Sequence, residues 1–180
     1  MTVAQTGVVR AKPPARAGSA HALAEEIKAE LGEAWLPRLY RERIMPLRTR
    51  SFQLPPAKHA TEVSVQHTLL GVELKIGRKR LSCPDLATAR YLAVFARLGV
   101  EAVAVPYDIT RTSPLADALE SSWQRMLLLI EHGAQARTHA FAVRVRRLLA
   151  GAAREEIAAA GAGAAVPQFN QNTKQRPRRA

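Results

Sequence analysis

The sequence predicts an α+β fold: a small mixed sheet, built from a basic β-hairpin and one parallel strand, with helices on its flanks and a C-terminal helical pair. Two observations support this class. Apolar and polar residues alternate between residues 63 and 83, and apolar residues recur at helical spacing on either side. With 180 residues and 47% hydrophobic content, the chain has the size of one domain with tails. We expect this domain at 19–158, between disordered basic tails at 1–18 and 159–180.

The first helix is predicted to start at Ser19. A serine at this position can accept a hydrogen bond from the free N–H groups of the first turn. Leu23, Ile27 and Leu31 then recur every four residues, which places them on one buried face. A second, short helix is expected at residues 37–44, because its proline can only open a helical turn.

The clearest strand pattern follows. Residues 47–54 lie between prolines and fit either an edge strand or a loop. After them, apolar residues alternate with polar ones in two runs, which is typical of strands with one buried face. Strands are therefore expected at residues 63–65, 72–76 and 80–83, with a turn at Gly77 and Arg78.

A strand–helix–strand unit is predicted next. Pro84 and Asp85 suit the first turn of a helix that runs to about Leu98, and Gly99 suits its C-terminal end. The apolar run 100–105 is typical of a buried strand. Because the return is short, we expect this strand to lie parallel to the hairpin through a right-handed crossover.

The C-terminal pair of helices is predicted from its start and stop signals. Ser113 and Pro114 form an N-cap followed by a first-turn proline. Trp123 lies on the apolar face of that helix, so we expect it in the core. Gly133 should end the helix, and a further helix is expected from about Ala134 to Leu149 or beyond.

The charge of the chain predicts a polyanionic partner. The net charge is +12, of which the acid-free stretches 1–24 and 161–180 hold seven. Nucleic acid is the expected partner, bound through phosphates with strong salt dependence, although RNA and DNA are not distinguished. An assembly or regulatory factor that binds an acidic protein is an alternative. The expected phosphate contacts are Arg38, Arg41, Arg43, Arg48, Arg50, Lys75, Arg78, Lys79 and Arg80.

Several classes of protein are disfavoured by what the sequence lacks. The single cysteine, Cys83, excludes an internal disulfide and a cysteine-rich metal site. No phosphate-binding loop and no serine-hydrolase or zinc-protease motif occurs. No apolar run is long enough for a membrane span, so a cytoplasmic location is expected. The acid-free N-terminus is also compatible with organellar import.

One motif points to an enzyme. Glu73 and Lys75 flank Leu74 and share one face of the expected strand. A carboxylate beside an ammonium group can bind a divalent metal and orient a water molecule for phosphodiester attack, and Glu62 is a second candidate ligand. Together with the surrounding helices and strands, residues of about 20–107 resemble the PD-(D/E)xK nuclease superfamily. The resemblance implies a Mg²⁺-dependent nuclease that uses Glu62, Glu73 and Lys75. The leading expectation remains a non-catalytic protein without a cofactor.

Overall fold

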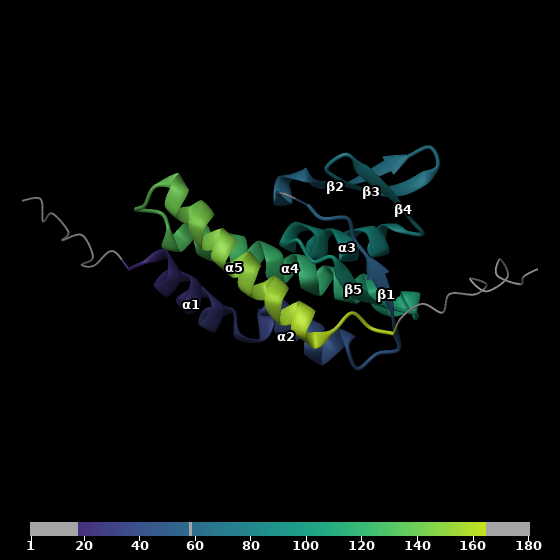
Figure 1. The fold of residues 1–180 in the computed structure, drawn as a ribbon, viewed down its shortest axis with the longest axis horizontal. Helices are drawn as coiled ribbons and strands as arrows, with labels where there is room; N and C mark the ends of the chain where they lie inside the picture. Colours follow the sequence, from purple (N-terminus) through teal and green to yellow (C-terminus); the bar gives the residue numbers. More distant parts are fainter. Residues whose placement is uncertain (1–17, 58, 165–180) are drawn as a thin grey trace, which may run out of the picture.

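The protein is built in layers that follow the predicted α+β class. The computed structural model describes residues 18–57 and 59–164. A three-stranded antiparallel sheet covers α3, α4 packs against α3, and α1 and α5 lie on the other side of these two helices (Figure 1). The α+β prediction is confirmed. The long helices are α1 (Ala20–Leu31), α3 (Leu86–Leu98), α4 (Ile109–Gly133) and α5 (His139–Ala160).

The predicted hairpin is part of the three-stranded sheet. Strands β2 (Val63–Thr68), β3 (Gly71–Ile76) and β4 (Lys79–Cys83) pair in sequence order, each antiparallel to the next. Leu74 and Ile76 are buried at 0% and 2% exposure, as their alternation predicts. The sheet contacts α3 through β2, β3 and β4, so its apolar face lies on that helix.

The prediction of a parallel strand beside the hairpin is wrong. Strand β5 (Ala102–Pro106) pairs antiparallel with β1 (Thr49–Gln53) in a separate two-stranded sheet. The other edge of β5 meets two tyrosines in place of a strand. The Ala104 N–H donates to the Tyr40 hydroxyl over 2.9 Å, and the Tyr91 hydroxyl donates to the Ala104 carbonyl over 2.6 Å. Since these groups satisfy its backbone, β5 needs no partner in the hairpin.

The first two helical segments match the prediction. The Ser19 hydroxyl accepts a hydrogen bond from the Ala22 N–H over 3.1 Å at the start of α1. The expected short helix is present as α2 (Leu36–Leu39), which continues into a π-helical turn at Tyr40–Ile44. Tyr40 and Ile44 are fully buried, so this turn anchors the start of β1 to the core.

The later helices differ from the prediction at their ends. Helix α3 begins after Asp85, which accepts from the Thr88 N–H over 2.7 Å, and it ends at Gly99 as expected. Helix α4 begins at Ile109 and not at Pro114, because Asp108 caps the earlier turn by accepting from the Thr110 N–H over 3.0 Å. The proline is thus inside the helix. Helix α5 begins at His139, later than the expected start at Ala134, and it continues beyond Leu149, as the prediction allowed.

The folded part of the chain also extends past residue 158, where a tail was expected. Helix α5 continues to Ala160, and the Tyr40 hydroxyl donates to the Gly161 carbonyl over 2.7 Å. The Ser51 N–H donates to the Ala164 carbonyl over 2.7 Å, and Ala164 forms a parallel bridge with Arg50. We call residues 161–164 the C-terminal strap. The predicted disorder of 1–17 and 165–180 concerns residues outside the described part.

One continuous core joins these layers. It extends from Ala20 in α1 to Ile157 in α5, and α3 lies at its centre with Tyr91 to Ala96 almost fully buried. Trp123 is 2% exposed, as predicted from its place on the apolar face of α4. In the described ranges, no helix is both long enough and apolar enough to cross a membrane.

Candidate anion-binding site

The structure places the predicted 38–50 cluster away from the hairpin. The segment α2 to β1 lies on the side of the molecule opposite the three-stranded sheet (Figure 1). Within the cluster, Arg38 is engaged by Glu42, with 2.9 Å between Nε and Oε1. The Arg48 guanidinium lies 5.3 Å from the centre of the Tyr107 ring. The other three side chains are exposed: Arg41, Arg43 and Arg50.

The hairpin cations lie on the turn between β3 and β4. Arg78, Lys79 and Arg80 are exposed, whereas Lys75 is partly buried. The turn is attached to the segment that precedes β2, because the Gly77 N–H donates to the Glu62 carbonyl over 3.0 Å. The hairpin turn and Glu62 are therefore neighbours in space.

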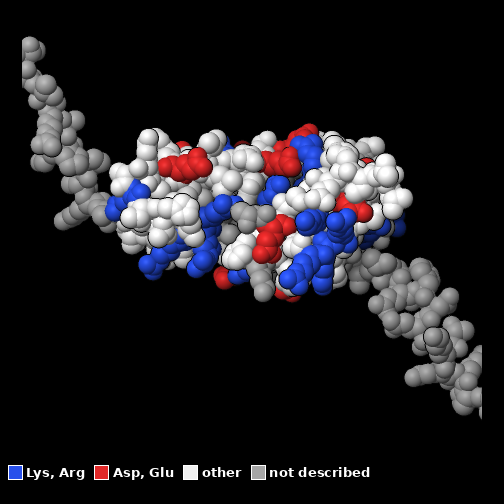
Figure 2. Space-filling model, turned by 90° about the horizontal axis from the view of Figure 1, so that it is seen from above, with Lys and Arg blue, Asp and Glu red and all other residues white. Residues whose placement is uncertain are grey.

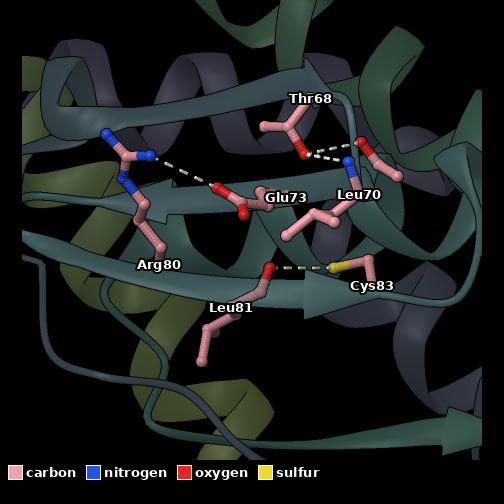
Figure 3. A network of polar contacts seen from close by, with 7 residues as sticks. Thr68, Leu70, Glu73, Arg80, Leu81 and Cys83 are labelled. Carbon is pink, nitrogen blue, oxygen red and sulfur yellow. Dashed lines mark hydrogen bonds and ion pairs between the residues drawn. The ribbon is translucent and has the colours of Figure 1, made fainter.

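The structure separates the residues of the expected nuclease motif. Glu73 lies opposite Gln66 in the β2–β3 register, whereas Glu62 precedes the first residue of β2. Four residues of extended strand, or about 13 Å, separate these two positions. The Glu73 carboxylate faces Arg80 at 3.7 Å, and its Oε2 atom is buried without a hydrogen-bond partner (Figure 3). Among the described residues, no group of three or more His, Cys, Asp or Glu side chains could hold a metal ion.

A basic cavity lies next to residues 57–60, where the C-terminal end of α3 meets α5. Its volume is about 340 Å³. Of the charged side chains in the described part of the chain, only cationic ones line it. We call this cavity the arginine pocket, and its basic side chains are His59, Arg97, Arg146, Arg147 and Arg154.

Two features of the backbone and core shape the pocket. The Arg146 guanidinium lies 5.4 Å from the centre of the Trp123 ring, and this cation–π contact holds it at the wall. At Gly151, in the interior of α5, the position that a Cβ atom would occupy has no atom within 4 Å apart from the adjacent residues and the backbone of its own helix. The missing side chain therefore leaves open space in the wall of the pocket.

The four arginines of the pocket are electrostatically uncompensated. Within residues 18–57 and 59–164, none of them has a carboxylate oxygen within 4.0 Å. By contrast, Arg90 in α3 contacts both Asp117 and Glu120 of α4. Like charges gathered at a concave surface raise the local positive potential, which attracts anions. The pocket is therefore the strongest candidate for a functional site.

On the face of α5 opposite the pocket, a charged side chain is paired with partners from neighbouring segments. The Glu156 carboxylate accepts from Lys28 Nζ over 2.6 Å and from Trp35 Nε1 over 3.1 Å. Burial raises the pKa of Glu156, but these two hydrogen bonds oppose it and the net effect is a lowered pKa. Helix α5 thus presents a paired carboxylate to α1 and unpaired arginines to the pocket.

Basic side chains are unevenly distributed over the face of the molecule that carries the three-stranded sheet. Figure 2 looks down on the three-stranded sheet and shows Lys and Arg side chains gathered mainly along one long side of this face. The link between Gly77 and Glu62 joins the hairpin turn to the segment that lines the pocket.

Sequence reasoning missed the pocket because it did not single out the arginines of residues 144–154 and because Arg97 lies far from them in the chain. One signal was present. Arg147, Gly151 and Arg154 follow the i, i+4, i+7 spacing of one helix face, with the glycine between the two cations. Comparisons of the chain with known protein families, curated proteins and solved structures find no match. The function is therefore inferred from the geometry and charge of the arginine pocket.

Proposed function

We propose that the protein binds nucleic acid through phosphate contacts and does not catalyse a reaction on it. The observation that carries this proposal is the arginine pocket, in which four arginines without carboxylate partners surround one cavity. The hairpin turn extends this surface with three exposed cations. Guanidinium groups suit phosphate oxygens because they donate two parallel hydrogen bonds.

The remaining basic residues support a partner with many phosphates. The 38–50 cluster supplies exposed arginines on another side of the molecule, and residues 165–180 add four positive charges and no acid. A small anion would engage one such place, whereas a nucleic-acid chain can engage several. Each phosphate that Lys or Arg neutralises releases counterions, so the affinity depends on salt.

The test is the salt dependence of binding to single-stranded and duplex DNA and RNA. For the wild type, log K should fall linearly with log salt concentration. The Arg147→Ala/Arg154→Ala variant should have a slope shallower by about 1.4 to 1.8, since each lost phosphate contact removes about 0.7 to 0.9.

The matched control is Arg125→Ala/Arg144→Ala. It removes the same charge from exposed positions on α4 and α5 that do not line the pocket. Its slope should stay closer to that of the wild type. Affinity that is absent at low salt, or that does not change with salt, would contradict the proposal.

The same preparations distinguish the two alternatives. Cleavage that requires Mg²⁺ and is abolished by Glu73→Gln would support a nuclease and contradict a non-catalytic role. Capture of an acidic protein that persists after nuclease treatment, together with no affinity for nucleic acid, would support a protein partner. We expect neither result.

A further inference from the structure

We propose that the arginine pocket holds a single phosphate monoester, and that in the bound nucleic acid this group is the terminal phosphate of a strand. This inference rests on the proposed function and narrows it from phosphate contacts in general to the recognition of a strand end. Three properties of the pocket support it: its charge, its size and the way its walls are built.

The charge of the pocket exceeds what an internal phosphate requires. A phosphodiester within a strand carries one negative charge, whereas a phosphate monoester carries about 1.5 to 2 near pH 7. Four arginines surround the cavity, and in the described ranges no carboxylate pairs with any of them. The dianionic end group therefore matches this site better than an internal phosphate does.

The size of the cavity also favours one end group. At about 340 Å³ it lies near the lower limit of small-molecule sites, which span roughly 300 to 1,000 Å³. Such a volume suits a phosphate with part of its nucleotide. The exposed cations of the hairpin turn, in contrast, suit a backbone that runs across an open surface.

The walls converge on this volume from three parts of the chain. Arg97 comes from the end of α3, His59 from the segment before β2, and the other three arginines from α5. The contact with Trp123 fixes Arg146 before any ligand arrives, which lowers the cost of ordering it. The open space at Gly151 leaves room for phosphate oxygens between Arg147 and Arg154.

The test compares oligonucleotides of one sequence that carry a 5′-phosphate, a 3′-phosphate or only hydroxyl ends. At a fixed salt concentration, one phosphorylated form should bind at least about tenfold more tightly than the hydroxyl form. Inorganic phosphate and adenosine monophosphate serve as competitors. They distinguish a site for strand ends from a site for free phosphorylated molecules.

Two independent variants should abolish the preference. Arg147→Ala/Arg154→Ala removes two guanidinium groups, and Gly151→Glu places a carboxylate in the open space of the pocket wall. Glutamate has a higher helix propensity than glycine, so the second variant should remain folded. Arg125→Ala/Arg144→Ala is the matched control outside the pocket, and it should retain the preference.

The outcomes separate this inference from the proposed function. Equal, salt-dependent affinity for all three oligonucleotides would overturn the end-recognition site and leave nucleic-acid binding intact. A preference that survives in both pocket variants would also overturn it. If adenosine monophosphate or phosphate binds in the pocket but no oligonucleotide binds, the monoester site stands and the nucleic-acid proposal fails. If none of the probes binds, both fail.

Discussion

Tyr40 joins three segments of the chain through one hydroxyl group. It accepts from the Ala104 N–H of β5 and donates to the Gly161 carbonyl of the C-terminal strap. The side chain is fully buried, so no water can replace these partners easily. Loss of this hydroxyl should therefore weaken the contacts of both β5 and the C-terminal strap with Tyr40.

We predict that Tyr40→Phe lowers the free energy of unfolding by about 1 to 3 kcal/mol, because it leaves the Ala104 N–H and the Gly161 carbonyl without this partner. Urea denaturation measures the change. Tyr107→Phe is the control: Tyr107 is 47% exposed, and its ring contact with Arg48 does not need the hydroxyl. A loss of equal size in both variants would contradict the assignment.

A second prediction concerns alkaline pH. Burial raises the pKa of Tyr40, although its hydrogen bond with Ala104 opposes this, and burial raises the pKa of Tyr91 further. In the unfolded chain a tyrosine ionises near pH 10. The folded state favours the neutral phenols, so their contribution to stability is complete below about pH 10 and is lost as the pH rises above it.

The measurement is the urea midpoint between pH 8 and pH 11. It should decrease above about pH 10 in the wild type and decrease less in Tyr40→Phe, which has one buried phenol fewer. A midpoint that rises over this range, or a decrease that is identical in the two proteins, would contradict the prediction.

Among the elements, α4 carries an internal proline. Pro114 is exposed and lies within the helix, where it cannot donate to the Thr110 carbonyl four residues earlier. We predict that Pro114→Ala stabilises the protein by about 1 kcal/mol or more, because it supplies this hydrogen bond and a better helix former. The melting temperature measures the effect.

Pro56→Ala provides the comparison for Pro114→Ala. Pro56 is exposed in the segment between β1 and β2, outside any helix or strand. Replacing it should change stability by less than about 1 kcal/mol and in the destabilising direction, since it frees the unfolded chain. A Pro114→Ala variant that is less stable than the wild type would contradict the prediction and would indicate that the proline stabilises the first turns of α4.

The elements also show what the sequence could and could not predict. Alternation identifies β2, β3 and β4 because neighbouring strands and a tight turn are local features. The apolar composition of residues 102–106 predicts a buried strand but not its partner. Pairing with β1 depends on Tyr40 and Tyr91, which occupy the other edge of β5 only after the helices have packed.

Over the whole molecule, the two halves of the chain are held together by its last described residues. The strap bonds to Tyr40 and to Ser51, and Gly163 within it has φ +80°. A Cβ atom at Gly163 would lie 2.7 Å from Thr49 Oγ1. The strap therefore fits beside β1 only with glycine at this position.

We predict different effects for truncation after Ala164 and after Ala160. The first removes four positive charges and should leave the melting temperature unchanged while it makes the salt dependence of nucleic-acid binding shallower. The second also removes the strap and should lower stability by about 1 to 3 kcal/mol. Equal stability of the two truncated proteins would show that the strap contributes nothing.

The candidate site was predictable only in part, because part of it is assembled by tertiary packing. The hairpin cations stand out because they are consecutive in the sequence. Three pocket arginines lie on α5, but Arg97 lies about fifty residues earlier in the chain, and only the packing of α3 against α5 brings it beside Arg147 and Arg154. Charge in the sequence predicts an anionic partner, whereas tertiary structure decides where the charge converges.

The strap also affects how the protein is made. Lys28 and Trp35 contact Glu156, and Arg50 in β1 pairs with Ala164. These contacts can form only after residues 156 and 164 have been synthesised. Until residue 164 leaves the ribosome, a nascent chain would expose the buried side of α1 and an unpaired edge of β1. Such surfaces are prone to association during synthesis. We expect nascent chains that end before residue 161 to depend on chaperones and chains that include the strap to be released from them.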